Sequence, residues 1–198
     1  MNHTVTMLSI DLLERFGTAL RALGLPIAEE LNPGLSDAEM DALTGPLGFA
    51  LPTELRTLFG WHDGSRRTPD ADLAFSVFAP GGGFRPLTEM IEDYKSSCKI
   101  AADAAPYGLW LPTFFPVVLM NPSPGAHLDV PEGAPSPVNL VYWGDAESPG
   151  EPDLRSVGEL FTYYCLALEE GVYVHQGNGR IHISRENANK FTWPNALP

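Results

Sequence analysis

The chain has 198 residues, a length that predicts one domain with its own hydrophobic core and no need for metal or disulfide staples. Twelve Lys and Arg residues stand against 25 Asp and Glu residues, which gives a formal net charge of −13. This charge argues against direct binding to nucleic-acid phosphates and favours a basic protein partner, although it can also serve solubility alone.

Two helices are predicted near the amino terminus. The first begins at a Ser9 cap, carries apolar residues at helical spacing and ends at Gly24. The second begins with Ser36 and Glu39, which have the spacing of a capping box, and ends at Gly45. We expect both helices to bury one apolar face.

A third, short helix is predicted around Pro52, whose missing N–H costs nothing in a first helical turn. One face of this helix is apolar at helical spacing: Leu51, Leu55, Leu58 and Phe59. The next residues, His62 to Gly64, predict a turn in which Gly64 takes a positive φ angle.

The rest of the chain mixes strand and helix signals. Four strands are predicted, with Pro-rich loops between the last three, over residues 71–78, 115–120, 126–130 and 138–143. One helix is predicted after a Thr88 cap, and another begins with a capping box at Ser156 and Glu159 and ends at Gly171. A hairpin is predicted over residues 172–184. This order of elements predicts an α+β fold, with helices packed on one face of a mostly antiparallel sheet.

The cysteine spacing and the lack of a recognisable targeting signal favour a protein of the cell interior. Cys98 and Cys165 lie far apart in predicted helices, which is typical of small buried residues and not of a zinc or disulfide site. Residues 1–13 contain no Lys or Arg, unlike a secretory signal, and no apolar run approaches a membrane-spanning length. We expect a soluble, cytoplasmic protein with no metal or other cofactor.

The residues that could perform chemistry form no convincing set. His127 and Asp129 alternate on one predicted strand and could supply two metal ligands, but no third ligand has a telling spacing. His62 and Asp63 are adjacent, and adjacent side chains rarely point at one target. An enzyme or small-molecule binder using His62, His127 and Asp129 therefore ranks last, and we expect no catalytic residues.

The acidic charge is concentrated in one part of the sequence. No Lys or Arg occurs between Lys99 and Arg155, and most acids of this stretch fall in loops beside the predicted strands. Such loops can form one acidic surface suited to a basic protein, or the charge can be a diffuse solubilising field. The candidate partner-binding residues are Asp129, Glu132, Asp145, Glu147, Glu151 and Asp153.

Two blocks of the sequence have a recognisable pattern. The third helix and its turn supply the first block, with Leu51, Pro52, Leu55, Leu58, Phe59, Trp61, Asp63 and Gly64. The second block contains Trp110, Gly125, Leu128 and Asp129. In this order they resemble the "LP-x-x-L-x-x-L/F-Y … N-G" and "W-x-P … G-x-x-L-x-x-D" motifs of the SUKH superfamily. That family is named partly for a fungal regulator of cell-wall synthesis and includes bacterial immunity proteins of toxin systems.

The resemblance covers about residues 35–171 of a single domain over residues 1–198. The first helix (9–24) and the carboxy-terminal hairpin and tail (172–198) are then additions. It implies an α+β fold with a twisted, mostly antiparallel sheet and helices packed around it. It also implies binding without catalysis, because family members neutralise a cognate toxin protein, often a nuclease. The alternative is a regulatory protein-interaction module that has no toxin partner.

Overall fold

The computed structural model describes residues 5–25, 30–48, 50–65, 82–103, 114–116, 119–120, 126–129, 141–143, 154–175 and 181–191. Its helices, including the short 3-10 helix η1, are α1 (Ile10–Ala22), α3 (Asp37–Thr44), η1 (Gly45–Leu47), α4 (Thr53–Trp61), α6 (Leu87–Asp103), α7 (Val157–Glu169) and α8 (Arg185–Ala188). Its strands are β1 (Gly82–Gly83), β2 (Phe114–Pro116), β3 (Leu119–Met120), β4 (Ala126–Asp129), β5 (Val141–Trp143), β6 (Tyr173–His175) and β7 (Ile181–Ile183).

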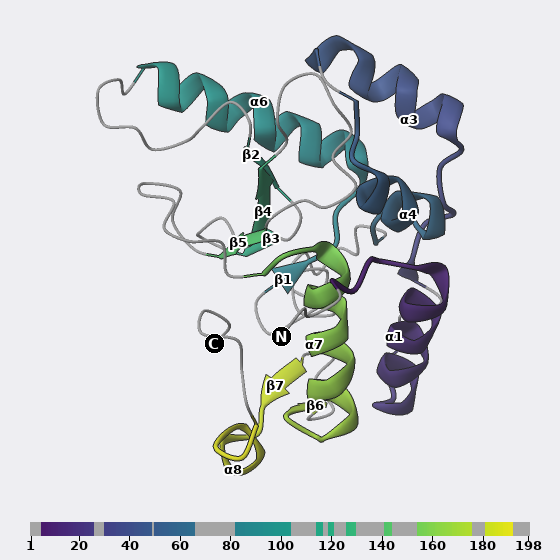
Figure 1. Ribbon diagram of the computed structural model, residues 1–198, viewed down its shortest axis with the longest axis vertical. Coiled ribbons are helices and arrows are strands. Elements are labelled where there is room, and N and C mark those ends of the chain that lie inside the picture. Colours follow the sequence, from purple (N-terminus) through teal and green to yellow (C-terminus); the bar gives the residue numbers. More distant parts are fainter. Residues whose placement is uncertain are drawn as a thin grey trace.

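Helices and antiparallel strands together make this an α+β protein. Among the described strands, β4 lies between β2 and β5, β1 pairs with β3, and β6 pairs with β7. Helices α3 and α6 lie at one end of the molecule and α8 lies at the other, while α1 runs beside α7 (Figure 1). The predicted strand over 71–78 lies outside the described residues. No helix in the described ranges is long and apolar enough to cross a membrane.

The predicted caps of the first two helices are confirmed. Ser9 accepts a hydrogen bond from the Leu12 N–H at the start of α1. At α3, the Ser36 hydroxyl accepts from the Glu39 N–H while the Glu39 carboxylate accepts from the Ser36 N–H, which completes the capping box. Gly64 has the predicted positive φ angle, 70°.

Two caps differ from the prediction. Ser156 accepts from the Glu159 N–H as expected, but the Glu159 carboxylate accepts from the residue before Ser156 and not from Ser156 itself. Helix α6 begins at Leu87, two residues before the start at Glu89 that a Thr88 cap would give. Its first N–H is accepted by the Asp63 carboxylate at 2.7 Å, so the cap comes from a distant part of the chain and Thr88 lies inside the helix.

One hydrophobic core joins elements from both ends of the chain. The apolar face predicted for α4 is buried, and α1 adds three side chains that are wholly inaccessible to solvent: Leu13, Phe16 and Leu20. Phe16 meets the ring of Phe161 in α7 edge-on, with 5.2 Å between ring centroids. Helix α1, predicted as an addition to the domain, therefore shares its core with α4 and α7.

The carboxy-terminal hairpin is found where it was predicted, with Tyr173 opposite Ile183. The residues between its two strands lie outside the described residues. Ser184 then caps α8, a short helix that was not predicted from the sequence. In the tail that follows, Phe191 packs against the core.

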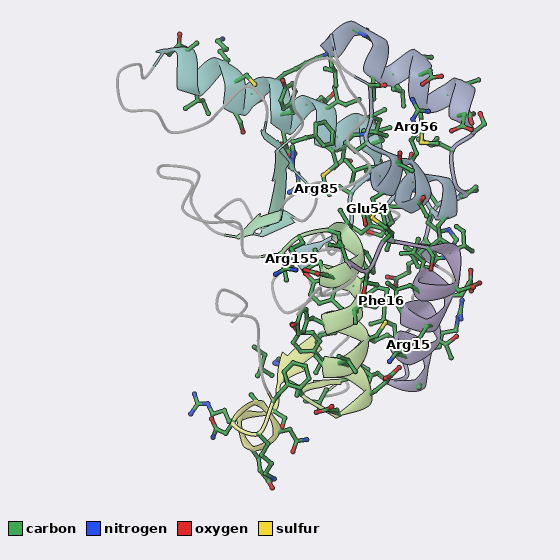
Figure 2. All side chains as sticks on the ribbon, in the orientation of Figure 1. Arg15, Phe16, Glu54, Arg56, Arg85 and Arg155 are labelled. Carbon is green, nitrogen blue, oxygen red and sulfur yellow. The ribbon has the colours of Figure 1, made fainter. Side chains whose placement is uncertain are left out.

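A buried carboxylate joins the amino-terminal segment, α4 and α7. Glu54 lies in the first turn of α4 with only 1% of its surface exposed. Its Oε1 accepts the N–H groups of Leu8 and Gly158 at 2.8 and 2.9 Å, and its Oε2 accepts that of Val157 at 3.1 Å. Figure 2 shows Glu54 where α4 meets one end of α7. Glu54 thus caps α7, a helix more than a hundred residues away in sequence.

Burial raises the pKa of Glu54, while the three N–H donors act in the opposite direction. The donors satisfy the carboxylate oxygens that burial takes away from water, and this makes the buried position tolerable. The same contact leaves little freedom for substitution at residue 54.

Replacing Glu54 with Gln tests how much the fold depends on this carboxylate. A Gln amide has one acceptor oxygen, so its NH2 group would face a backbone N–H that Glu54 now satisfies. We expect the Glu54→Gln variant to lose about 1–3 kcal/mol of unfolding free energy. Urea unfolding measures this loss, with Glu170→Gln, at an exposed position just after α7, as the matched control. Equal midpoints for the two variants would show that Glu54 is not a stabilising contact.

Candidate functional site

The partner-binding residues predicted from sequence fall mostly where the structure gives no description. Only Asp129 lies in a described element, at the end of β4, where it is opposite Phe114 of β2. The remaining five, Glu132, Asp145, Glu147, Glu151 and Asp153, lie outside the described residues. An acidic surface formed by these loops therefore stays a prediction.

The residues that carry the family resemblance are largely part of the core. Leu51, Leu55, Leu58 and Phe59 each have at most 1% of their surface exposed, and Pro52 precedes α4 and is buried. Trp61 is 8% exposed and donates its indole N–H to Glu14 of α1 at 2.8 Å. Leu128 and Asp129 lie in β4, whereas Trp110 and Gly125 lie outside the described residues. The first motif thus builds the α4 packing surface.

The turn after α4 holds three segments together. The Asp63 carboxylate accepts the first N–H of α6, while the Asn32 side chain donates to the Asp63 carbonyl oxygen at 2.8 Å. The Asn32 backbone N–H donates a hydrogen bond to the Gly64 carbonyl oxygen. The Asn32 carbonyl oxygen lies 2.7 Å from Nδ1 of His62. The side chains of His62 and Asp63 therefore have separate partners and do not form an acid–base pair with each other.

Carboxylates from three elements gather beside this turn. We use the term carboxylate face for Glu39 of α3, Asp63 of the turn, and Glu89, Glu92 and Asp93 of α6. Burial raises the pKa of Asp63, and the negative charges of Glu39 and Glu89 raise it further. Burial also raises the pKa of Asp93, together with the charges of Glu89 and Glu92 and against that of Arg85. Asp63 and Asp93 thus each lie near two other carboxylates of this face.

Arginines in this part of the molecule form pairs within the fold. Arg85 donates to the Asp93 carboxylate at 3.0 Å. On the other side of α3, Arg56 binds both Asp37 and Asp41 and also donates to the Leu51 carbonyl. Arg56 therefore joins α3 to α4.

The carboxylate face was not predicted because its acids do not form an uninterrupted acidic stretch of sequence. Glu39, Asp63 and Glu89 are separated by about two dozen residues each, and basic residues lie between them. The detectable signals were local: α3 contains acids and no base, and three acids occur within five residues at the start of α6. Their proximity depends on α3 packing against α6.

The other candidate groups show no assembled chemistry in the part of the chain that is described. There, no group of three or more His, Cys, Asp or Glu side chains could hold a metal ion. Burial raises the pKa of the Cys165 thiol to about 11, so this cysteine is protonated at neutral pH and is a poor nucleophile. His127 lies in β4 opposite Pro116 and Tyr142, whereas His62 follows α4.

No protein-family model and no curated protein matches this sequence. The function must therefore be argued from the residues and their arrangement.

Replacing Asp63 with Asn tests the repulsion within the carboxylate face. Because the pKa of Asp63 is higher in the folded protein than in the unfolded chain, its protonation stabilises the fold. That contribution is present at low pH and is lost as the pH rises through the folded-state pKa. The asparagine introduced at this position cannot titrate, but its amide oxygen can still accept the Leu87 N–H.

We therefore expect Asp63→Asn to be at least as stable as the wild type at about pH 7, and to gain less stability on acidification towards about pH 4. Urea unfolding at a series of pH values measures both effects. Glu186→Gln, on the exposed surface of α8, is the control and should follow the wild type. A pH dependence identical in all three proteins would rule out a titrating repulsion at Asp63.

Proposed function

We propose that this chain is a non-catalytic binding protein of the immunity type, which neutralises a basic toxin domain inside the cell. The resemblance to the SUKH superfamily suggests the class of function and a SUKH-like arrangement of the α+β fold. The observation that supports it best is the carboxylate face, where the negative charges of Glu39, Glu89 and Glu92 oppose the ionisation of Asp63 and Asp93.

A basic partner would relieve this repulsion. Each Lys or Arg side chain placed against Glu39, Glu89 or Glu92 would replace a like-charge contact with an attractive one. The net charge of −13 would also attract such a partner at long range and increase its association rate at low salt. A nuclease domain, with a basic cleft for phosphates, is one partner of this chemistry.

The acids predicted from sequence to bind a partner are the alternative to the carboxylate face. They are Asp129, Glu132, Asp145, Glu147, Glu151 and Asp153. Charge-neutral variants can separate these alternatives, because the two sets of residues do not overlap.

The experiment captures partners from the native lysate on the immobilised protein, at low and at high salt. We expect one basic protein to bind at low salt and to be lost at high salt. Expressed alone, the captured protein should arrest growth, and co-expression of the present chain should restore it. Capture of housekeeping proteins without toxicity would instead favour a regulatory interaction module.

Three variants then locate the interface on the captured partner. Glu89→Gln with Glu92→Gln tests the carboxylate face. Asp145→Asn, Glu147→Gln and Asp153→Asn, combined in one protein, test the loop acids. Glu170→Gln with Glu186→Gln is the control, because it removes the same charge as the first variant from the end of the molecule far from α3 and α6 (Figure 1). We expect the association rate to fall by about threefold or more in an interface variant and to change little in the control. Equal rates for all variants would contradict an acidic interface.

A further inference from the structure

The amino-terminal segment lies against the start of α7. We call residues 5–9 the strap. Within the described residues, two hydrogen bonds join residues 5–8 of the strap to other elements: the Leu8 N–H donates to Glu54, and the Ser156 hydroxyl donates to the Thr6 carbonyl. Leu8 is the buried side chain of the strap, with 6% of its surface exposed, whereas Thr6 is exposed. In the part of the chain that the structure describes, residues 5–8 are therefore held by two hydrogen bonds and one buried side chain.

Both helices beside the strap keep their caps without it. Helix α1 is capped by the side chain of Ser9, through the Leu12 N–H, and that bond does not involve residues 5–8. At α7, Glu54 accepts the N–H groups of Val157 and Gly158, and Ser156 accepts that of Glu159. Rotation of the backbone at Ser9 would thus break the two strap bonds and leave both helix ends satisfied.

Gly158 shows how closely the strap approaches the α7 backbone. A Cβ atom at this position would lie 2.4 Å from the Leu8 nitrogen, the Met7 carbonyl carbon and the Thr6 oxygen. These are backbone atoms, so no side-chain rotation could make room. Glycine is a poor helix former, yet Gly158 lies in the first turn of α7. Its presence there is explained by the strap, which leaves no room for a side chain.

We propose that residues 5–8 form the moving part of this strap, hinged at Ser9, and open as a unit from the native protein while α1 and α7 stay folded. Opening exposes the Glu54 carboxylate and the amino-terminal end of α7 to solvent and to other molecules. The strap is thus a device that controls access to a buried negative charge. Segments with few buried contacts are those that open locally, at a free-energy cost below that of global unfolding.

Hydrogen exchange of the wild-type protein, followed by NMR at low urea concentrations, tests the opening directly. A local opening exposes little surface, so we expect exchange of the Leu8 amide to depend only weakly on urea. It should also be faster than exchange of the Val157 and Gly158 amides, which keep Glu54 as their acceptor. Exchange of Leu8 with the same urea dependence as Phe16 and Leu160, in the core of α1 and α7, would overturn the proposal.

The Gly158→Ala variant displaces the strap without altering any of its hydrogen-bonding groups. Alanine also favours helix in α7 by about 1 kcal/mol over glycine, which offsets the loss of strap contacts. We expect a folded protein in which the Leu8 amide exchanges about tenfold faster or more, while the Phe16 and Leu160 amides change little.

Gly45→Ala is the matched control, because nothing lies within 4 Å of a Cβ atom added there. It should leave exchange at Leu8 unchanged. Unfolding of Gly158→Ala, or full protection of its Leu8 amide, would show that the strap is an integral part of the core and would overturn the proposal.

Discussion

The contact on which the rest of this structure depends is the buried carboxylate of Glu54. It brings the amino-terminal segment, α4 and the start of α7 to one point through three backbone N–H groups. A buried carboxylate without such donors would cost several kcal/mol, and two of the three donors belong to α7, so α4 and α7 must be in place together. The core between α1, α4 and α7 then forms around this point, with Phe16 and Phe161 in edge-on contact.

Helix α4 organises its neighbours from both ends by the same physical means. At its start, Glu54 caps α7, and just beyond its end, Asp63 caps α6. Along its length, Arg56 binds the two aspartates of α3. A helix of nine residues and the turn that follows it therefore position three other helices through side-chain contacts, while the apolar face of α4 fills the core. This explains the composition of the first motif, in which apolar residues and Asp63 are needed for packing and capping even without a partner.

Local signals in the sequence predicted much of the fold. The caps at Ser9 and Ser36, the apolar face of α4 and the positive φ angle of Gly64 each depend on residues within one or two helical turns. The predicted cap of α6 at Thr88 was wrong because the observed cap is Asp63, 24 residues before the start of the helix. No local pattern distinguishes that acid from an ordinary turn residue. Glu54 was missed although a signal existed: it precedes Leu58 by four residues and Trp61 by seven, so it lies on the buried side of its helix.

The candidate site was harder to predict for a related reason. The loop acids could be chosen from sequence because they lie in one stretch without Lys or Arg, whereas the carboxylate face combines acids that only tertiary packing brings together. The charge of this surface depends on where the arginine side chains lie as well as on the acids. Arg15 binds Glu169 between α1 and α7, Arg56 binds α3, and Arg85 binds Asp93. These arginines join elements of the fold in pairs that are partly exposed to solvent. The pairs do not change the net charge of −13, and a field of that sign favours approach of positively charged molecules.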